Sequence, residues 1–148
     1  MTTTDEVRSG TVELDGAPLA YELAGAGPVV VLVHAGIADR RMWDAQVGPL
    51  SDRFTVLRYD LRGFGESPDA PGRYAHHEQL LALLDHLGFE QVAGVGCSMG
   101  SYVLLSAAVV APERFRHLVV LSPVIDGVEP TDSVRVAWRE EAAALDVG

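Results

Sequence analysis

Five residues from Gly96 to Gly100 form the pattern Gly-x-Ser-x-Gly, with Ser98 at its centre. An apolar run suited to a buried strand begins at Val92, and apolar residues at helical spacing follow the pattern as far as Val110. In a tight strand-to-helix turn, a strained backbone exposes the serine hydroxyl at the apex. Glycines fit on both sides because strand and helix approach too closely for a Cβ. We therefore predict that Ser98 is a nucleophile.

The same turn offers a place for the negative charge that forms when a carbonyl group is attacked. Ser98 would lie at the N-terminus of the following helix, where free N–H groups and the helix dipole favour an anion. The backbone N–H of Met99 is then a candidate donor to this oxyanion. Nucleophile and donor together indicate acyl transfer through a serine.

Two other interpretations of this turn are less favoured. Its glycines also fit the start of a nucleotide-binding turn, but that fingerprint has a third glycine where this chain has Met99. It also has an acidic residue closing the next strand, whereas the strand expected at 117–121 is followed by Ser-Pro. Cys97 is a poor nucleophile candidate, because small residues would be needed at Val95 and Met99. We interpret Cys97 as an inert, partly buried thiol.

The composition is that of an acidic globular protein. The chain has 148 residues, enough for one domain, with 48% hydrophobic residues and a formal net charge of −10. Nucleic acids and anionic membranes require basic patches, so we expect neither as a partner. A single cysteine allows no internal disulfide, and we find no signal-peptide pattern and no apolar run of transmembrane length. We therefore expect a cytoplasmic protein.

Apolar patterns predict alternating strands and helices along most of the chain. Strands are expected at 11–14, 19–23, 29–33, 54–59, from 92 to the serine turn, and at 117–121. Helices are expected at 42–50, from about 74 to 88, from the serine turn to about 112, and at 133–145. The unbroken β-branched run at 29–33 is typical of a parallel strand covered on both faces. We predict an α/β fold with a mostly parallel sheet and helices on both faces.

In such a sheet, ligands bind beyond the C-terminal ends of the strands. His34, Asp60 and Ser98 each follow a predicted strand, so all three are expected at one rim. Asp60 is expected to pair with Arg62 or to cap the turn that follows it. His76 starts a leucine-rich helix and is expected to be solvated. No pair of histidines has the spacing of metal ligands, so we predict no metal.

Three motifs now agree in order and spacing. His34-Ala-Gly36 follows one apolar strand, Asp60-x-Arg62-Gly63-x-Gly65-x-Ser67 follows the next, and Gly-Cys-Ser-Met-Gly follows a third. Together they resemble the α/β-hydrolase superfamily, especially its small esterase and enol-lactonase-like branch, from about residue 11 onward.

The resemblance implies a role for each matching residue. Ser98 matches the nucleophile, and the backbone N–H groups of Met99 and Gly36 (or Ile37) match the oxyanion donors. His34 matches a position that shapes the rim and supports the oxyanion loop. The substrate would be a small-molecule ester or lactone, and neither an organic cofactor nor a metal would be required.

Two departures from the family pattern matter. The family usually has a glycine where this chain has Ala35, so the oxyanion loop is expected to be slightly displaced. The triad of this fold runs in the order serine, acid, histidine, yet the only histidine after Ser98 is His117, at the amino end of its strand. His34 lies at the correct rim but is a poor surrogate base. Asp126, after the last predicted strand, is a candidate for the triad acid.

We therefore interpret the chain as the N-terminal portion of a hydrolase. It would comprise a flexible N-terminus at 1–9, a partial α/β-hydrolase core at 10–126, and the start of a lid or cap helix at 127–148. The last strands and the histidine loop would be missing, so hydrolysis of esters or lactones would be incomplete or weak. The alternative is a non-catalytic fragment that self-associates, or complements another fragment, through the strand edge near Val119–Leu121.

Overall fold

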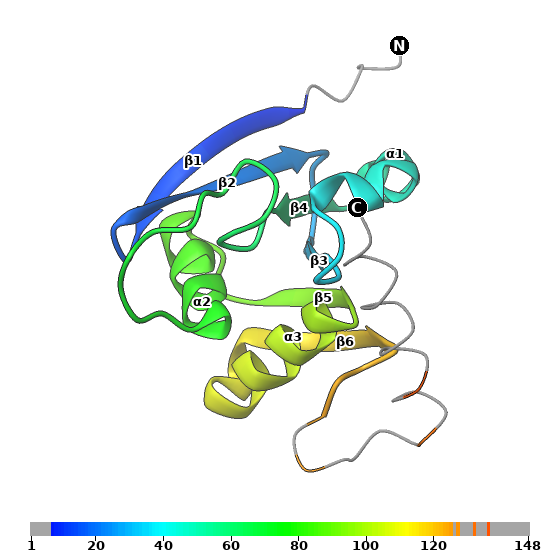
Figure 1. Ribbon diagram of the computed structural model, residues 1–148. Helices are drawn as coiled ribbons and strands as arrows, with labels where there is room; N and C mark the ends of the chain where they lie inside the picture. The colour runs from blue at the N-terminus through cyan, green and yellow to red at the C-terminus, as the bar shows by residue number, and fades with distance from the viewer. Residues whose placement is uncertain (1–6, 126, 128–131, 133–135, 137–148) are drawn as a thin grey trace.

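The computed structural model describes residues 7–125, 127, 132 and 136 (Figure 1). The strands are β1 (Arg8–Leu14), β2 (Ala17–Ala24), β3 (Val29–Val33), β4 (Thr55–Tyr59), β5 (Val92–Cys97) and β6 (Phe115–Leu121). The helices are η1 (Arg40–Trp43), α1 (Asp44–Ser51), α2 (His76–His86), α3 (Met99–Val110) and η2 (Pro112–Arg114), where η marks a 3-10 helix. Apart from residue 136, the expected helix at 133–145 lies outside the described residues, and so does the candidate acid Asp126.

All six strands form one sheet in the order β1-β2-β4-β3-β5-β6. β1 and β2 form an antiparallel hairpin, and β2 is also antiparallel to β4. From β4 through β3 and β5 to β6 the strands are parallel. The unbroken run at Val29–Val33 therefore forms a central parallel strand, and its last four side chains are buried. The predicted α/β fold with a mostly parallel sheet is confirmed.

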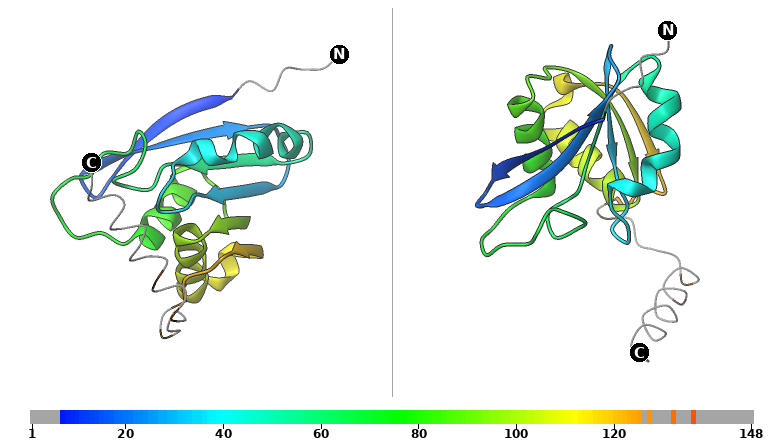
Figure 2. Two further views of the ribbon diagram at one scale, coloured as in Figure 1. Left: turned by 45° about the vertical axis from the view of Figure 1, so that its right-hand side comes forward. Right: turned by 90° about the horizontal axis from the view of Figure 1, so that it is seen from above.

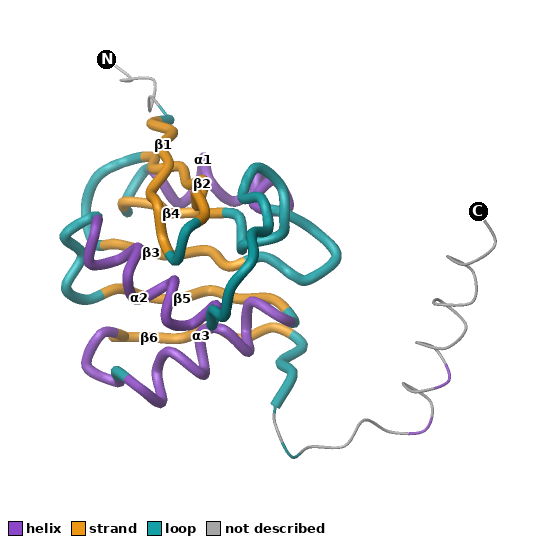
Figure 3. Tube along the Cα trace, turned by 60° about the vertical axis from the view of Figure 1, so that its left-hand side comes forward, coloured by secondary structure: helices purple, strands orange, loops and turns teal. Residues whose placement is uncertain are grey.

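Helices cover both faces of the sheet, as predicted. α2 and α3 lie side by side on one face, and α1 lies on the other (Figures 2 and 3). The larger core forms under α2 and α3, where Leu80, Leu83 and Leu84 of α2 and Leu104 of α3 are fully buried. Spacings of three and four residues give α2 the apolar stripe that it buries. The smaller core forms under α1, where Trp43 and Val47 pack against β3 and β4.

Several element boundaries differ from those predicted. β1 begins at Arg8, so Arg8 and Ser9 are paired with β2 instead of belonging to a flexible N-terminus. α2 begins at His76, two residues later than expected, and it ends before Gly88, whose positive φ of 72° favours glycine. No helix in the described part of the chain is long and apolar enough to cross a membrane.

Candidate active site

Ser98 lies at the turn between β5 and α3, in the strained backbone that the sequence predicts. Its φ of 50° and ψ of −112° fall in a region that residues with a side chain rarely adopt. The Ser98 N–H donates to the carbonyl of Leu121 at the end of β6, with an N···O distance of 2.8 Å. Such strain persists where the surrounding structure enforces it, and it is concentrated at functional sites.

The glycines on both sides are required by close backbone contacts. A Cβ on Gly96 would lie 2.6 Å from the carbonyl carbon of Gly100. A Cβ on Gly100 would overlap the carbonyl oxygens of Val33 and His34, at the end of β3. The start of α3 is therefore pressed against the C-terminal end of the central strand. This contact places Ser98 directly beside the loop that follows β3.

Ser101 stabilises the turn through hydrogen bonds of its hydroxyl group, a role that the sequence did not indicate. Its buried hydroxyl donates to the Gly96 carbonyl at 2.8 Å and accepts the Leu121 N–H at 3.1 Å. The hydroxyl thus joins β5, α3 and the end of β6. A serine three positions after the nucleophile is too common a residue at a helix start to signal this role by itself.

The structure brings the two predicted oxyanion donors together. A Cβ on Gly36 would lie 3.0 Å from Sδ of Met99 and 3.4 Å from its Cβ, so these residues are neighbours. Met99 is the first residue of α3, where a backbone N–H has no partner within the helix. Next to Gly36, the side chain of Ile37 is 93% exposed. The loop after β3 therefore approaches the N-terminus of α3 at Gly36.

His34 is completely buried, and both of its ring nitrogens are engaged. Nδ1 lies 2.7 Å from the carbonyl oxygen of Ala35, and Nε2 lies 2.9 Å from the N–H of Leu61. Burial lowers the pKa of His34 below its ordinary value of 6.5, and the hydrogen bond to Ala35 offsets this in part. A neutral ring with its hydrogen on Nδ1 satisfies both contacts. His34 therefore has no free lone pair with which to act as a surrogate base.

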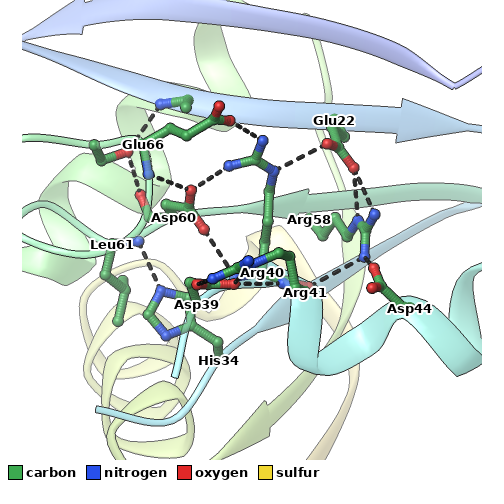
Figure 4. A network of polar contacts seen from close by, with 12 residues as sticks. Glu22, His34, Asp39, Arg40, Arg41, Asp44, Arg58, Asp60, Leu61 and Glu66 are labelled. Carbon is green, nitrogen blue, oxygen red and sulfur yellow. Dashed lines mark hydrogen bonds and ion pairs between the residues drawn. The ribbon is translucent and has the colours of Figure 1, made fainter. Parts of the chain in front are cut away.

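Asp60 is also completely buried, and it pairs with Arg40 instead of Arg62 (Figure 4). One carboxylate oxygen accepts the Arg40 backbone N–H at 2.7 Å. The other oxygen accepts from the Arg40 guanidinium and from the Glu66 N–H, the latter at 2.8 Å. The predicted capping of the turn is therefore confirmed, and the predicted pairing with Arg62 is wrong.

Arg62 turns away from Asp60 and packs into a different part of the molecule. Its guanidinium lies 4.1 Å from the centre of the Tyr74 ring and 3.3 Å from the carbonyl oxygen of Asp15. Asp69, an exposed residue, approaches Nε at 3.5 Å. Arg62 therefore ties the loop before α2 to the turn between β1 and β2.

His76 is half-buried, which contradicts the expectation that it is solvated. Its ring meets that of Tyr74 edge-on at 5.1 Å, and its buried Nδ1 has no hydrogen-bond partner among the described residues. Burial lowers the pKa of His76, and the nearby His34 and Arg62 lower it further.

His117 lies at the opposite end of the sheet from Ser98, as predicted. It is exposed near the start of β6, beside a cavity of about 460 Å³ that Val29, Phe54 and Val92 also line.

Cys97 is a free, half-buried thiol next to Ser98. Among the described residues, no group of three histidine, cysteine or acidic side chains is arranged to hold a metal.

The fold and the strained serine turn are those of an α/β-hydrolase. The family model for the alpha/beta hydrolase fold matches residues 28–146, and the chain belongs to this family. The resemblance stated from the sequence is therefore confirmed.

Individual relatives agree with this assignment. The chain is 30% identical to a zearalenone hydrolase from Cladophialophora bantiana over 76% of this chain and 46% of that protein. It is 32% identical to 3-oxoadipate enol-lactonase 2 from Acinetobacter baylyi over 63% of this chain and 36% of that protein. A hydrolase structure from Pseudomonas aeruginosa superposes with a TM-score of 0.77 at 35% identity, covering 95% of this chain and 53% of that one. The chain thus spans about half or less of the length of these relatives.

Proposed function

We propose that this chain supplies the nucleophile and the oxyanion donors of a hydrolase that cleaves ester or lactone bonds through an acyl-serine. The observation that carries this proposal is the strained Ser98 at the start of α3, with Met99 packed against Gly36. A lactone substrate is in keeping with the relative named as an enol-lactonase.

The proposed reaction proceeds in two halves. The Ser98 hydroxyl oxygen attacks the carbonyl carbon as it loses its proton, and the N–H groups of Met99 and Gly36 stabilise the charge that moves onto the carbonyl oxygen. Collapse of this intermediate breaks the bond to the alcohol oxygen, which takes up a proton. Water then attacks the acyl-serine and releases the acid and the free serine.

The proton of the Ser98 hydroxyl needs a base to accept it. Two of the histidines are unsuitable as this base. His34 is buried with both nitrogens engaged, and His117 lies at the far end of the sheet. We infer that the base comes from polypeptide beyond the described residues, which is in keeping with the greater length of the relatives. Without that base, the oxyanion site and binding alone would leave an acceleration of at most about 10³- to 10⁴-fold over water.

Labelling with a fluorophosphonate tests this proposal. We expect intact-mass spectrometry to show slow addition of one phosphonyl group, mapped to Ser98, and no addition to Ser98→Ala. Ser122→Ala is a matched control because Ser122 is an exposed serine just beyond β6. Absence of labelling in a chain that circular dichroism shows to be folded, or undiminished labelling of Ser98→Ala, would contradict the proposal.

A second candidate function, association through β6, rests on a separate observation. Among the described strands β6 pairs with β5 alone, and Val119 and Leu121 are 51% and 45% exposed. β6 carries Arg116 near its start, but residues 118–121 carry no charge, whereas the other edge strand, β1, carries Arg8 and Glu13. Charged side chains protect an edge strand against pairing, and an uncharged apolar edge invites it. We propose that β6 accepts a further strand from a second copy or from a complementing fragment.

Sedimentation velocity over a range of concentrations tests self-association. We expect the wild-type chain to form dimers or larger species, and Val119→Lys to be monomeric. Val109→Lys is the matched control because Val109 is 84% exposed and lies on α3 instead of β6, and it should associate like the wild type. A wild-type chain that stays monomeric at every concentration would exclude self-association.

A further inference from the structure

The loop from His34 to Asp39 is anchored at both of its ends to the same point of the structure. At the first end, Nε2 of His34 accepts the Leu61 N–H at 2.9 Å. At the second end, the Asp60 carboxylate binds both the backbone N–H and the guanidinium of Arg40. Asp60 and Leu61 directly follow β4, so the end of one strand holds the loop that follows its neighbour (Figure 4).

Between these anchors the loop has few hydrogen bonds of its own, one of which joins the Ala35 N–H to Sδ of Met42 at 3.3 Å. The Ala38 N–H donates to the Ala35 carbonyl at 3.1 Å and closes a single turn. Gly36 lies inside that turn, against Met99, and it has no side chain to hold it in place. The position of its N–H therefore depends on the two anchors.

Arg40 is well placed to act as the stronger anchor. Its side chain is only 12% exposed and also reaches Glu22 on β2, at 3.1 Å from Nε, and Glu66. Burial by itself would lower the pKa of the guanidinium, but hydrogen bonds to Glu66 and Glu22 raise it above the ordinary value, so Arg40 stays charged. A planar guanidinium with several donors fixes orientation better than a single ammonium group does.

The Asp60 side of the pair is equally constrained. The carboxylate has no exposure to solvent, and a Cβ on Gly65 would overlap it. The Glu66 N–H holds the oxygen that also faces the guanidinium. Because the surrounding turn fixes Asp60, this carboxylate can in turn fix Arg40.

We propose that Arg40 is a positioning residue, whose ion pair with Asp60 holds the 34–39 loop so that the Gly36 N–H can face the oxyanion. This inference rests on the proposed function of Ser98. It adds the ion pair that fixes the position of the second oxyanion donor, the Gly36 N–H. Arg40 does not touch the reacting atoms and acts through the loop.

A double variant separates this role from a general loss of stability. Arg40→Gln alone would leave Asp60 buried without its cation, which is strongly destabilising. Arg40→Gln/Asp60→Asn removes both charges. Asparagine keeps the shape of Asp60 but only one oxygen to accept the backbone N–H groups of Arg40 and Glu66, and glutamine is shorter than arginine. Glu22 retains Arg58 at 2.7 Å in this variant. Arg41→Gln is the matched control, because Arg41 is 78% exposed and pairs with Asp39.

Two readouts test the proposal on the full chain. In the folded double variant, we expect amide hydrogen exchange at Gly36 and Ile37 to quicken by about tenfold or more, while exchange in β3 changes little. We expect the rate of Ser98 labelling by the fluorophosphonate to fall by about 10- to 100-fold, since small displacements of a donor are costly. Arg40→Lys should retain part of the rate, and Arg41→Gln should match the wild type in both readouts.

The outcomes distinguish this proposal from the proposed function. Unchanged loop exchange in the folded double variant would overturn it, and so would faster exchange with an unchanged labelling rate. If the wild-type chain is not labelled at all, the proposed function fails. The exchange readout then decides whether Arg40 holds the loop, because that measurement needs no reactivity at Ser98.

Discussion

Replacing Gly100 by alanine should destabilise the protein by about 3 kcal/mol, because the new methyl group has no space. A Cβ at this position would overlap the carbonyl oxygens of Val33 and His34. These atoms belong to the backbone and cannot rotate away as a flexible side chain can. We expect the urea concentration at the midpoint of unfolding to fall sharply in Gly100→Ala. Circular dichroism or tryptophan fluorescence would monitor the unfolding.

Gly48→Ala is the matched control for this substitution. Gly48 lies in α1, and a Cβ there would meet no atom within 4 Å. Alanine favours a helix over glycine by about 1 kcal/mol, so Gly48→Ala should be neutral or stabilising. Equal changes in the two variants would show that α3 does not press on the end of β3 as described.

Removing Arg62 should have the second large effect. Arg62→Ala would leave a cavity among buried groups and would remove the partner of the Tyr74 ring and of the Asp15 carbonyl. Large-to-small changes in a core and unpaired buried polar groups each cost a few kcal/mol. We expect a loss of about 3 kcal/mol in the free energy of unfolding, measured by urea denaturation.

The control for Arg62 is a cation at the surface. Arg41→Ala removes an exposed arginine whose ion pair with Asp39 is screened by water, so this variant should be almost as stable as the wild type. Arg62→Lys should lie between Arg62→Ala and the wild type, because lysine keeps the charge but lacks the planar group that stacks on Tyr74. An Arg62→Ala variant as stable as Arg41→Ala would contradict the packing described for this loop.

Much of the fold could be predicted because it follows from local patterns. The β-branched run of β3 and the leucine spacing of α2 depend on burial, which the chain encodes residue by residue. The serine turn was equally clear, since Gly96 and Gly100 mark the two closest backbone approaches of the site. In each case the neighbours along the chain carry the necessary information.

The long-range polar contacts could not be predicted, because they join distant parts of the chain. Asp60 and Arg62 are close in sequence and suggested a pair, but Asp60 turns toward η1 while Arg62 turns toward the β1-β2 turn. Arg40 lies twenty residues before Asp60, at the start of η1, where the sequence shows no periodicity. Only the parallel pairing of β3 with β4 brings these two residues together.

The first strand shows a second limit of sequence patterns. Ser9 and Gly10 are polar or small and do not indicate a strand. They pair with Glu22 and Tyr21 through the register of the hairpin, as an edge strand does when backbone hydrogen bonds decide its extent. A pattern of side chains carries little information where the side chains are exposed.

The measurement that most directly tests the central claim is formation of an acyl-enzyme at Ser98. The chain would be incubated with p-nitrophenyl acetate and analysed by intact-mass spectrometry and peptide mapping. We predict a single acetyl group on Ser98 that persists, because loss of the acyl group needs a base to activate water. Acetylation of Cys97 in place of Ser98, or equal acetylation of a folded Ser98→Ala variant, would contradict the claim.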